Sequence, residues 1–315
     1  MKRSAFLAGL MLFAASAFAQ YPERPIRLVI PFAAGSSTDA IVRVITEVVA
    51  KSLGQPIVLD NKPGADTMIA GNEVFKSKPD GYTLLVATGS LTAVPALRKS
   101  PPYDPLTDFT PITDVGRYTL FLYVNADVPA KTLQELFAYA KANPGKLNYA
   151  TSSVSNIVAT AQMNTMAGVQ MAAVPYKSAP AAVVDLVANR VQVMWDPPTT
   201  GIAHVREGKL RALATANLTR SALLPNVPTM AEAGLPGFVG PSFMGLVGPA
   251  KMPPEIVNRL NREFGAAMRN PDVIAALEKQ AFALNPSTPA QFGEFLKVQV
   301  ETHSRLLKAA GIEPQ

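Results

Sequence analysis

The chain has 315 residues, a formal net charge of +6 and no cysteine, so disulfides, thiolate metal sites and cysteine nucleophiles are excluded. Its basic residues are scattered along the sequence without an arm or cluster, which argues against nucleic acid as a partner. A length near 300 residues is enough for a sizeable core and suggests two lobes of about 150 residues each.

The N-terminal segment has the features of an export signal. Lys2 and Arg3 precede an apolar stretch from Ala5 to Phe18, and Ala17-Phe18-Ala19 offers small residues where cleavage would occur. The apolar stretch is too short for a spanning helix, which needs about 20 apolar residues. We therefore predict a cleavable signal peptide over residues 1–19 and a mature protein that is soluble outside the cytoplasm.

A strand–loop–helix unit follows the signal. Ile26–Pro31 is apolar and typical of a buried strand, Gly35-Ser36-Ser37 forms a loop, and Asp39–Leu53 has a helical pattern that ends at Gly54. A unit of this kind directs backbone N–H groups and a helix N-terminus at whatever occupies the loop, which favours an anion. With no catalytic set in view, we expect the loop to hold a small acid.

The alternation of strands and helices continues beyond this unit. Ile57–Asn61 and Thr83–Ala87 are predicted strands, Thr67–Lys76 is a predicted helix between them, and Thr88-Gly89-Ser90 is a turn of small residues. Strands that are apolar on both faces and alternate with helices predict a parallel sheet covered by helices. Ligands of such sheets lie beyond the carboxyl ends of the strands.

A second strand–loop–helix unit lies near the middle of the chain. Tyr118–Val124 is a predicted strand and Thr132–Asn143 a predicted helix. Lys146–Ala150 is a strand that runs into the polar loop Thr151–Asn156, and a helix follows over Ile157–Ala167. This loop offers an anion the same donors as the first.

The last third of the chain completes two lobes. Its C-terminal helices have no sheet of their own, so we expect them to cover the first sheet. The first lobe is then discontinuous, with residues 20–124 and 247–315, and residues 125–246 form the second; the crossings are expected near Tyr123–Asp127 and Pro241–Pro249. The predicted strands here are Ala172–Tyr176, Val191–Asp196, Lys209–Ala216 and Phe243–Val247, and the predicted helices are Ala179–Ala188, Pro253–Arg269, Pro271–Gln280 and Thr288–Ala310, with a long loop at Leu223–Gly240.

Several sequence blocks resemble those of a known family. They cover essentially all of the mature chain, in the family's order and spacing. The blocks are Tyr21-Pro22, Pro25–Phe32, Asp60–Ala65, Pro79–Leu85, Tyr103-Asp104-Pro105, Ala142–Ala150, Val174–Lys177, Gly208–Ala214 and Pro228–Gly234. Together they resemble the Bug-type extracytoplasmic solute receptors of tripartite tricarboxylate transporters.

The resemblance implies an α/β, two-lobe periplasmic binding protein fold of a type II-like kind. Each lobe would be a mixed or parallel sheet flanked by helices, with two crossing strands as the hinge. The implied protein is a periplasmic monomer that closes on a small carboxylate and delivers it to the membrane components of a tripartite transporter. No cofactor, metal or nucleic acid is implied. A sensing protein that signals to a membrane sensor kinase is the alternative.

The resemblance also implies the binding residues. In the family, one ligand carboxylate is held after the first strand, largely by backbone groups and ordered water. The matching first-lobe positions are Phe32, Ala33, Ala34, Gly35, Ser36, Ser37, Thr38, Asp39, Thr88, Gly89 and Ser90, and those of the second lobe are Thr151, Ser152, Ser153, Ser155, Asn156, Pro175, Tyr176, Trp195 and Asp196.

Some of these positions have an alternative interpretation. The serines and Thr38 could cap the helix, Asp39 could orient the loop, hold a water or bind an ammonium group, and Trp195 could be a core residue. This chain has Gly35-Ser36-Ser37 where the family has a run of glycines. An aliphatic C4–C6 acid is the family expectation, and an aromatic carboxylate is the alternative.

Catalysis is not expected. His204 and His303 are far apart in the sequence, and no histidine–carboxylate cluster suggests zinc. A nucleophilic serine needs a base within reach, and no Gly-x-Ser-x-Gly turn is present. A periplasmic enzyme acting on a carboxylate is therefore the weakest of the three hypotheses.

Overall fold

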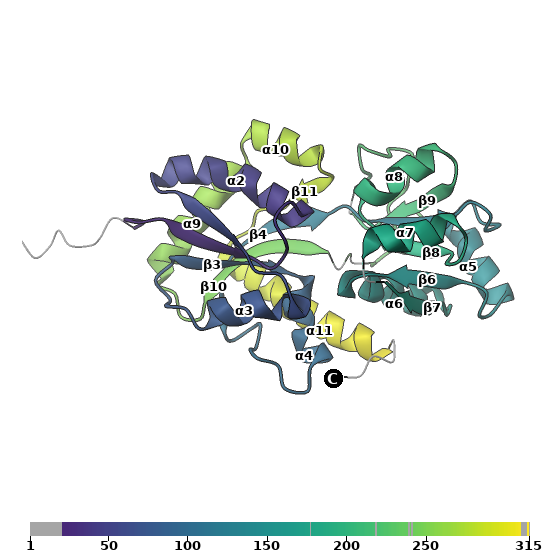
Figure 1. The fold of residues 1–315 in the computed structure, drawn as a ribbon, viewed down its shortest axis with the longest axis horizontal. Coiled ribbons are helices and arrows are strands. Elements are labelled where there is room, and N and C mark those ends of the chain that lie inside the picture. The colour runs from purple at the N-terminus through teal and green to yellow at the C-terminus, as the bar shows by residue number, and fades with distance from the viewer. Residues whose placement is uncertain are drawn as a thin grey trace, which may run out of the picture.

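Two α/β lobes, joined by two passages of the chain, make up the protein in the computed structural model (Figure 1). The structure describes residues 21–176, 178–217, 219–238, 240, 242–309 and 314. The predicted signal peptide, Gln20 and the predicted helix end at Ala310 lie outside the described residues. No helix in these ranges is long and apolar enough to cross a membrane.

The first lobe is built on a six-stranded mixed sheet. Its order is β11-β4-β10-β3-β1-β2, with β1 parallel to β2 and β3, and β10 antiparallel to β3 and β4. β11 pairs antiparallel with β4. The strands are β1 (Ile26–Ile30), β2 (Ile57–Asn61), β3 (Thr83–Thr88), β4 (Phe109–Tyr118), β10 (Phe243–Pro249) and β11 (Phe282–Leu284).

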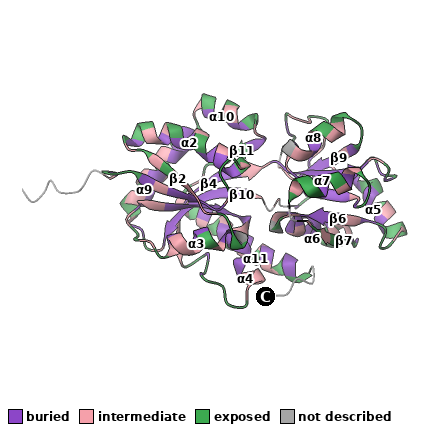
Figure 2. Ribbon diagram, viewed as in Figure 1, coloured by how far each residue is buried: buried purple, intermediate pink, exposed green. Residues whose placement is uncertain are grey.

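Helices cover both faces of this sheet, which explains why its central strands β1, β3 and β10 are predominantly apolar. Leu28 and Ile30 pack in one buried cluster with α2, α9 and α10, whereas Val29 packs in another with α3, α4 and α11. Figure 2 shows the sheet as a buried layer between exposed helix faces. The helices are α2 (Ser37–Leu53), the 3₁₀ turn η1 (Ala65–Thr67), α3 (Met68–Phe75), α4 (Gly89–Leu97), α9 (Pro254–Met268), α10 (Pro271–Glu278) and α11 (Pro289–Ala309).

The second lobe has a five-stranded mixed sheet in the order β7-β6-β8-β5-β9. β6 is parallel to β7 and β8, and β5 is antiparallel to β8 and β9. α5 and α6 pack on one face and α7 on the other. The elements are β5 (Phe121–Asn125), α5 (Leu133–Ala142), β6 (Asn148–Thr151), α6 (Val154–Ala167), β7 (Ala172–Pro175), α7 (Ala179–Val187), β8 (Val193–Asp196), α8 (Pro198–Arg206) and β9 (Leu210–Thr215).

The chain passes between the lobes at slightly different places than predicted. β4 ends at Tyr118 in the first sheet and β5 begins at Phe121 in the second, so the first passage is Thr119-Leu120. The return lies between Phe238, in the core of the second lobe, and Phe243 in β10. Both predicted boundaries, after residue 124 and before residue 247, are therefore too late, because an apolar run such as that of β5 or β10 does not reveal which sheet the strand joins.

Several elements were not predicted, three of them for a clear local reason. β4 and β11 were missed, and α4 begins at Gly89 where a turn was expected. Each has a local reason: β4 contains Pro111, β11 has three residues, and α4 contains Pro95. Proline disfavours both a strand interior and a helix interior, so the local pattern points away from the structure that forms.

Candidate functional site

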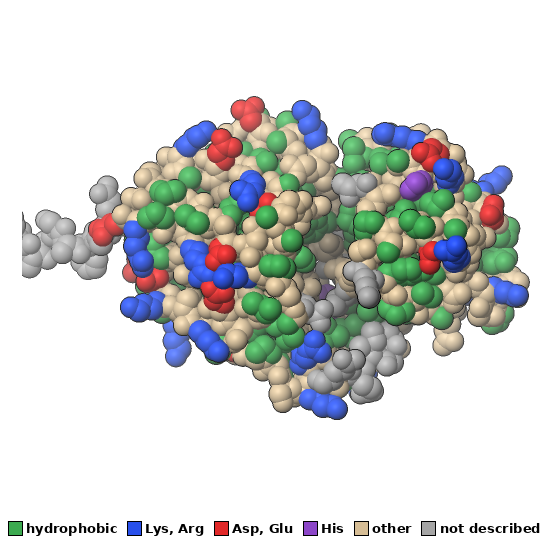
Figure 3. Space-filling model, in the orientation of Figure 1, with side chains coloured by type: hydrophobic (Ala, Val, Ile, Leu, Met, Phe, Trp, Pro, Cys, Tyr) green, Lys and Arg blue, Asp and Glu red, His purple; other side chains and the backbone are tan. Residues whose placement is uncertain are grey.

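The parallel strands of both sheets end at the edges that face one another. β1 and β3 end where β4 leaves the first lobe and β10 enters it, and β6 and β8 end where β5 begins and β9 ends. Because the chain passes between the lobes at these edges, they must lie opposite each other. Figure 3 shows a groove between the two lobes. The sequence-predicted residues lie on both edges.

The loop from Phe32 to Ser36 presents backbone groups at the first edge. Ala33, Ala34 and Gly35 are exposed, and Gly35 has a φ of 79°. Ser36 is the N-cap of α2, and its hydroxyl accepts a hydrogen bond from the N–H of Asp39. The first N–H groups of a helix have no partner within the helix. Those of the next two residues, Ser37 and Thr38, are therefore free for an anion.

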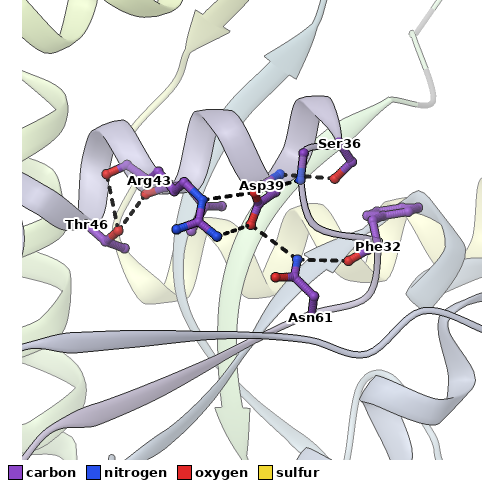
Figure 4. Close-up of polar contacts among 8 residues, drawn as sticks. Phe32, Ser36, Asp39, Arg43, Thr46 and Asn61 are labelled. Atoms are coloured by element: carbon purple, nitrogen blue, oxygen red, sulfur yellow. Dashed lines mark hydrogen bonds and ion pairs between the residues drawn. The ribbon is translucent and has the colours of Figure 1, made fainter.

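Asp39 is held by four protein hydrogen bonds (Figure 4). Arg43 donates to both carboxylate oxygens over 2.9 and 3.1 Å, the N–H of Gly35 donates over 3.0 Å, and the Asn61 amide donates over 3.2 Å. The same Asn61 amide donates to the carbonyl of Phe32. The hydrogen bonds from Arg43 lower the pKa of Asp39 despite its burial. Asp39 therefore orients the loop as a neutralised carboxylate, which leaves it little capacity for an ammonium group.

The N-terminus of α4 lies beside this loop at the same edge. Thr88 is its N-cap, but its side chain makes no capping bond. The residue is 6% exposed, and its hydroxyl has no hydrogen-bond partner. Gly89 and Ser90, expected in a turn, form the first turn of the helix. An unpartnered buried hydroxyl next to free helix N–H groups is a second indication of a binding site.

Thr38 connects the loop to the passage between the lobes. Its hydroxyl lies 2.6 Å from the hydroxyl of Tyr118, the last residue of β4. The next residue, Thr119, donates its N–H to the carbonyl of Ala281 and accepts a hydrogen bond from Asn217. Hydrogen bonds thus connect the loop to Tyr118, and its neighbour Thr119 to Ala281 and Asn217, at the passage between the lobes.

On the second edge, Asn156 organises the loop before α6. Its side-chain oxygen accepts hydrogen bonds from the N–H of Ser152 and the hydroxyl of Ser153, and its amide donates to the carbonyl of Trp195. Ser153 is the N-cap of α6. The helix begins three residues earlier than predicted, so Ser155 and Asn156 belong to its first turn. Asn156 is 3% exposed, and its amide is occupied by protein.

Two other predicted positions are engaged within the lobe. Thr151 donates its hydroxyl to the carbonyl of Ser153, and Tyr176 donates its hydroxyl to Asp185 of α7 over 2.9 Å. Pro175, before Tyr176, is the exposed end of β7. These contacts order the edge, and of these three residues only Pro175 is exposed.

Trp195 and Asp196 point to opposite faces of β8. Trp195 is fully buried and its ring stacks on Phe238 at 5.4 Å, so the structure supports the core alternative for this residue. Asp196 lies on the other face and receives a hydrogen bond from the hydroxyl of Thr200 in α8. Burial raises the pKa of Asp196 to about 7.

Sequence reasoning missed the residues that hold the first loop and the hinge. Arg43 stands four residues after Asp39, a spacing that brings opposite charges together on a helix. Asn61 ends a strand parallel to β1, where polar side chains reach the loop. Tyr118 was predicted to begin a strand rather than to end one, so its position carried no signal.

Two further observations concern metal ligands and a second hollow. No group of three or more metal-ligating side chains occurs in the described part of the chain. A hollow of about 910 Å³ lies elsewhere, between α5, α6 and β7 of the second lobe, with Lys141, Tyr149 and Asn164 in its wall. It contains none of the predicted site residues.

The amino-acid sequence matches a known family and curated relatives. The family described as tripartite tricarboxylate transporter family receptor (TctC) matches residues 41–312. A Cupriavidus necator protein, named UPF0065 protein in the gbd 5′ region, is 37% identical over 98% of this chain and 95% of its own length. Protein BugT of Bordetella pertussis is 34% identical over 92% of this chain and 90% of its own length.

Solved structures have the same fold. A protein described as a periplasmic transporter is 37% identical, with a TM-score of 0.78 over 93% of this chain and 99% of that one. The R. palustris protein Rpa4515, solved with adipate, is 30% identical, with a TM-score of 0.79 over 94% and 100%. MatC from Rhodopseudomonas palustris, solved with bound malate, is 31% identical, with a TM-score of 0.74 over 91% and 100%.

Proposed function

The chain belongs to the family of tripartite tricarboxylate transporter receptors, and from this premise we propose that it captures a small carboxylate between its lobes in the periplasm. It is a solute receptor and not an enzyme, as the family is. Its fold is that of the periplasmic binding proteins. Export by the predicted signal peptide and delivery to the membrane components of a tripartite transporter complete the proposal.

The observation that carries the proposal is the donor set at the first edge. Ser37 and Thr38 lie in the first turn of α2, where backbone N–H groups have no partner within the helix, and the buried hydroxyl of Thr88 at the start of α4 has no hydrogen-bond partner among the described residues. A helix N-terminus stabilises a nearby anion by about 0.3–1 kcal/mol, and by up to about 2 kcal/mol where it is partly buried. Two such termini side by side fit a carboxylate.

The second lobe supports an anionic ligand in the same way. α6 and α8 begin directly after β6 and β8, so their N-termini also lie at the groove. An elongated ligand with a carboxylate at each end would then meet helix N-termini from both lobes. Closure of the hinge would bury both ends and strengthen the charge-assisted hydrogen bonds.

An aliphatic dicarboxylate is the favoured ligand class. Relatives in the family were solved with adipate and with malate. The aromatic alternative depended partly on Trp195, whose ring is fully buried against Phe238. Ser36 and Ser37, in place of glycines, add hydroxyl groups that suit an oxygen-rich ligand.

The test is thermal unfolding of unfolded-and-refolded mature protein with a panel of aliphatic, aromatic and amino-acid carboxylates. Refolding removes any ligand that copurifies. A ligand at a hundredfold excess over its dissociation constant adds about 2.7 kcal/mol of stability, which raises the unfolding midpoint by several degrees for a protein of this size. Stabilisation by C4–C6 dicarboxylates is the expected result. A folded protein that no carboxylate stabilises would contradict the proposal.

A further inference from the structure

Asp196 is a buried carboxyl at the groove edge, and its charge has no cationic partner among the residues that the structure describes. It is the last residue of β8 and pairs with Phe121, which follows the first passage between the lobes. The residue is 3% exposed. The hydroxyl of Thr200 donates to it, and no described lysine, arginine or histidine forms an ion pair with it.

Among the described residues packed around β8, Tyr123 is the titratable group that approaches this carboxyl; Tyr176, in the same buried cluster, donates its hydroxyl to Asp185. Tyr123 of β5 lies close enough to interact with it electrostatically, and the buried tyrosine hydroxyl has no hydrogen-bond partner. α6 carries no titratable side chain over its described length. The other titratable side chains lie on the opposite face of the sheet or toward the far ends of their helices; these are Tyr149 in β6, Asp185 in α7, and His204 and Arg206 in α8.

This environment makes the ionised form of Asp196 costly. Burial removes water from a charge that no cation compensates, and this raises the pKa of Asp196 to about 7. Asp39, the acid of the first edge, differs because Arg43 keeps it ionised. Of the two acids at the groove, one is paired with an arginine, and the other has no cation beside it among the described residues, so that a proton can neutralise it.

We propose that Asp196 takes up one proton from solvent when a carboxylate binds, and that its protonated carboxyl then donates a hydrogen bond to the ligand. This inference rests on the proposed function and names a residue that selects the ligand's second end. Two carboxylates in one water-poor site cannot both stay ionised at low cost, and protonation converts a repulsive contact into a donor–acceptor pair. Release of the ligand returns the proton to solvent.

Isothermal titration calorimetry of the refolded mature protein tests the inference, with adipate and malate as probes. Each titration is repeated in two buffers of different ionisation enthalpy, and the difference in heat gives the number of protons taken up. Near pH 8 we expect about one proton per ligand bound. Between roughly pH 7.5 and 8.5 the dissociation constant should rise up to tenfold per pH unit, as uptake of one proton requires.

Asp196→Asn supplies a permanent amide donor in place of the protonated carboxyl. This variant should bind the same probe with no proton uptake and with a flat pH profile. Asp80→Asn, which changes a carboxylate paired with Arg24 in the first lobe and touches none of the predicted site residues, is the control and should keep the wild-type uptake.

The outcomes separate the inference from the proposed function. Binding by wild-type protein without proton uptake overturns the inference and leaves the receptor function intact. Tight binding of amino acids that weakens as the pH falls also overturns it, because an ionised Asp196 would then pair with an ammonium group. The wild-type uptake is informative even if Asp196→Asn fails to fold. Absence of binding by any carboxylate at any of these pH values contradicts the proposed function itself.

Discussion

At the scale of single residues, Asn61 holds the first loop in place through one side-chain amide. One side-chain amide joins the carbonyl of Phe32 to the carboxylate of Asp39, at 2.9 and 3.2 Å. It thereby ties the end of β2 to the loop that presents free N–H groups. The loop is exposed over Ala33–Gly35, so its shape depends on such cross-links.

Asn61→Ala should lower ligand affinity more than stability. Loss of its hydrogen bonds should cost about 1 kcal/mol of unfolding free energy, whereas the loosened loop should weaken carboxylate binding severalfold. Asn261→Ala is the matched control, because that amide also joins two carbonyls, those of Ile112 and Ser287. The control should lose similar stability and keep its affinity in calorimetric titration. Equal losses of affinity in the two variants would argue against a role for Asn61 in the loop.

Ser37→Asp should separate stability from binding. An acid in the first turn of α2 interacts favourably with the helix dipole, so the unfolding midpoint should not fall. The same charge repels a carboxylate at the free N–H groups, and affinity should drop roughly tenfold or more. Ser37→Asn, of equal size and no charge, should bind nearly as the wild type does. Unchanged affinity in Ser37→Asp would remove this loop from the site.

At the scale of elements, α11 meets α4 through a buried histidine. His303 is 1% exposed, and its Nδ1 lies 3.0 Å from the hydroxyl of Thr92 in α4. Its Nε2 is buried without a partner. Burial disfavours the charged ring and lowers the pKa of His303 to about 4. The packing of these two helices therefore requires a neutral imidazole.

His303→Gln should make the protein less sensitive to mild acid. The unfolded chain takes up a proton at this histidine below about pH 6.5, but the folded protein resists until about pH 4, so stability present at neutral pH is lost in between. At pH 5 the loss amounts to about 2 kcal/mol. Denaturant titrations at pH 7 and pH 5 should show a smaller difference for the variant than for wild type. His204→Gln, in the second lobe, is the control.

The elements that the sequence predicted well are those whose pattern and end signals agree. β1, β2 and α2 were placed within two residues because an apolar run, a capping serine and Gly54 all point to the same boundaries. α4 and β4 contain prolines that their surroundings tolerate: Pro95 lies in a helix of nine residues, and Pro111 lies in a strand of ten residues that pairs with β10. Packing against distant parts of the chain determines the secondary structure of α4 and β4, and the local sequence pattern does not contain that information.

The positions of the candidate site could be predicted from the sequence better than the hydrogen bonds of its side chains. Loop positions followed from the strand ends and the family resemblance, but the bonding of each side chain did not. Asn156 was expected at the ligand. Its amide N–H instead donates to the carbonyl of Trp195, and its side-chain oxygen accepts hydrogen bonds from Ser152 and Ser153. Such partners come from residues distant in the sequence, so only the fold reveals them.

At the scale of the whole molecule, the lobes touch beyond their two covalent connections. Ala93 of α4, Val158 of α6, and Leu306 and Leu307 of α11 form one buried cluster. The second lobe thus rests on two helices of the first, on the side where Figure 1 shows α11 running beneath both. We expect closure of the groove to be a rotation of the lobes that keeps this contact.

Ligand binding should therefore make the molecule more compact without changing either lobe. Small-angle X-ray scattering should show a smaller radius of gyration with saturating adipate or malate than without it. Ser37→Asp at the same ligand concentration should keep the larger radius. An unchanged wild-type radius, with binding verified by calorimetry, would mean that the ligand is held by one lobe alone.

The discontinuous first lobe would also set an order of events during the proposed export. A chain that crosses the membrane with its N-terminus first delivers β1 to β4 early, yet the sheet still lacks β10, and one face lacks α9 and α10. The second lobe runs without interruption from Phe121 to Phe238, so all the strands of its sheet would emerge together. The first lobe has to wait, with its apolar strands uncovered, until the last 75 or so residues arrive. In such an export, the strands that are translocated first would be the ones whose apolar faces stay exposed to aggregation for longest.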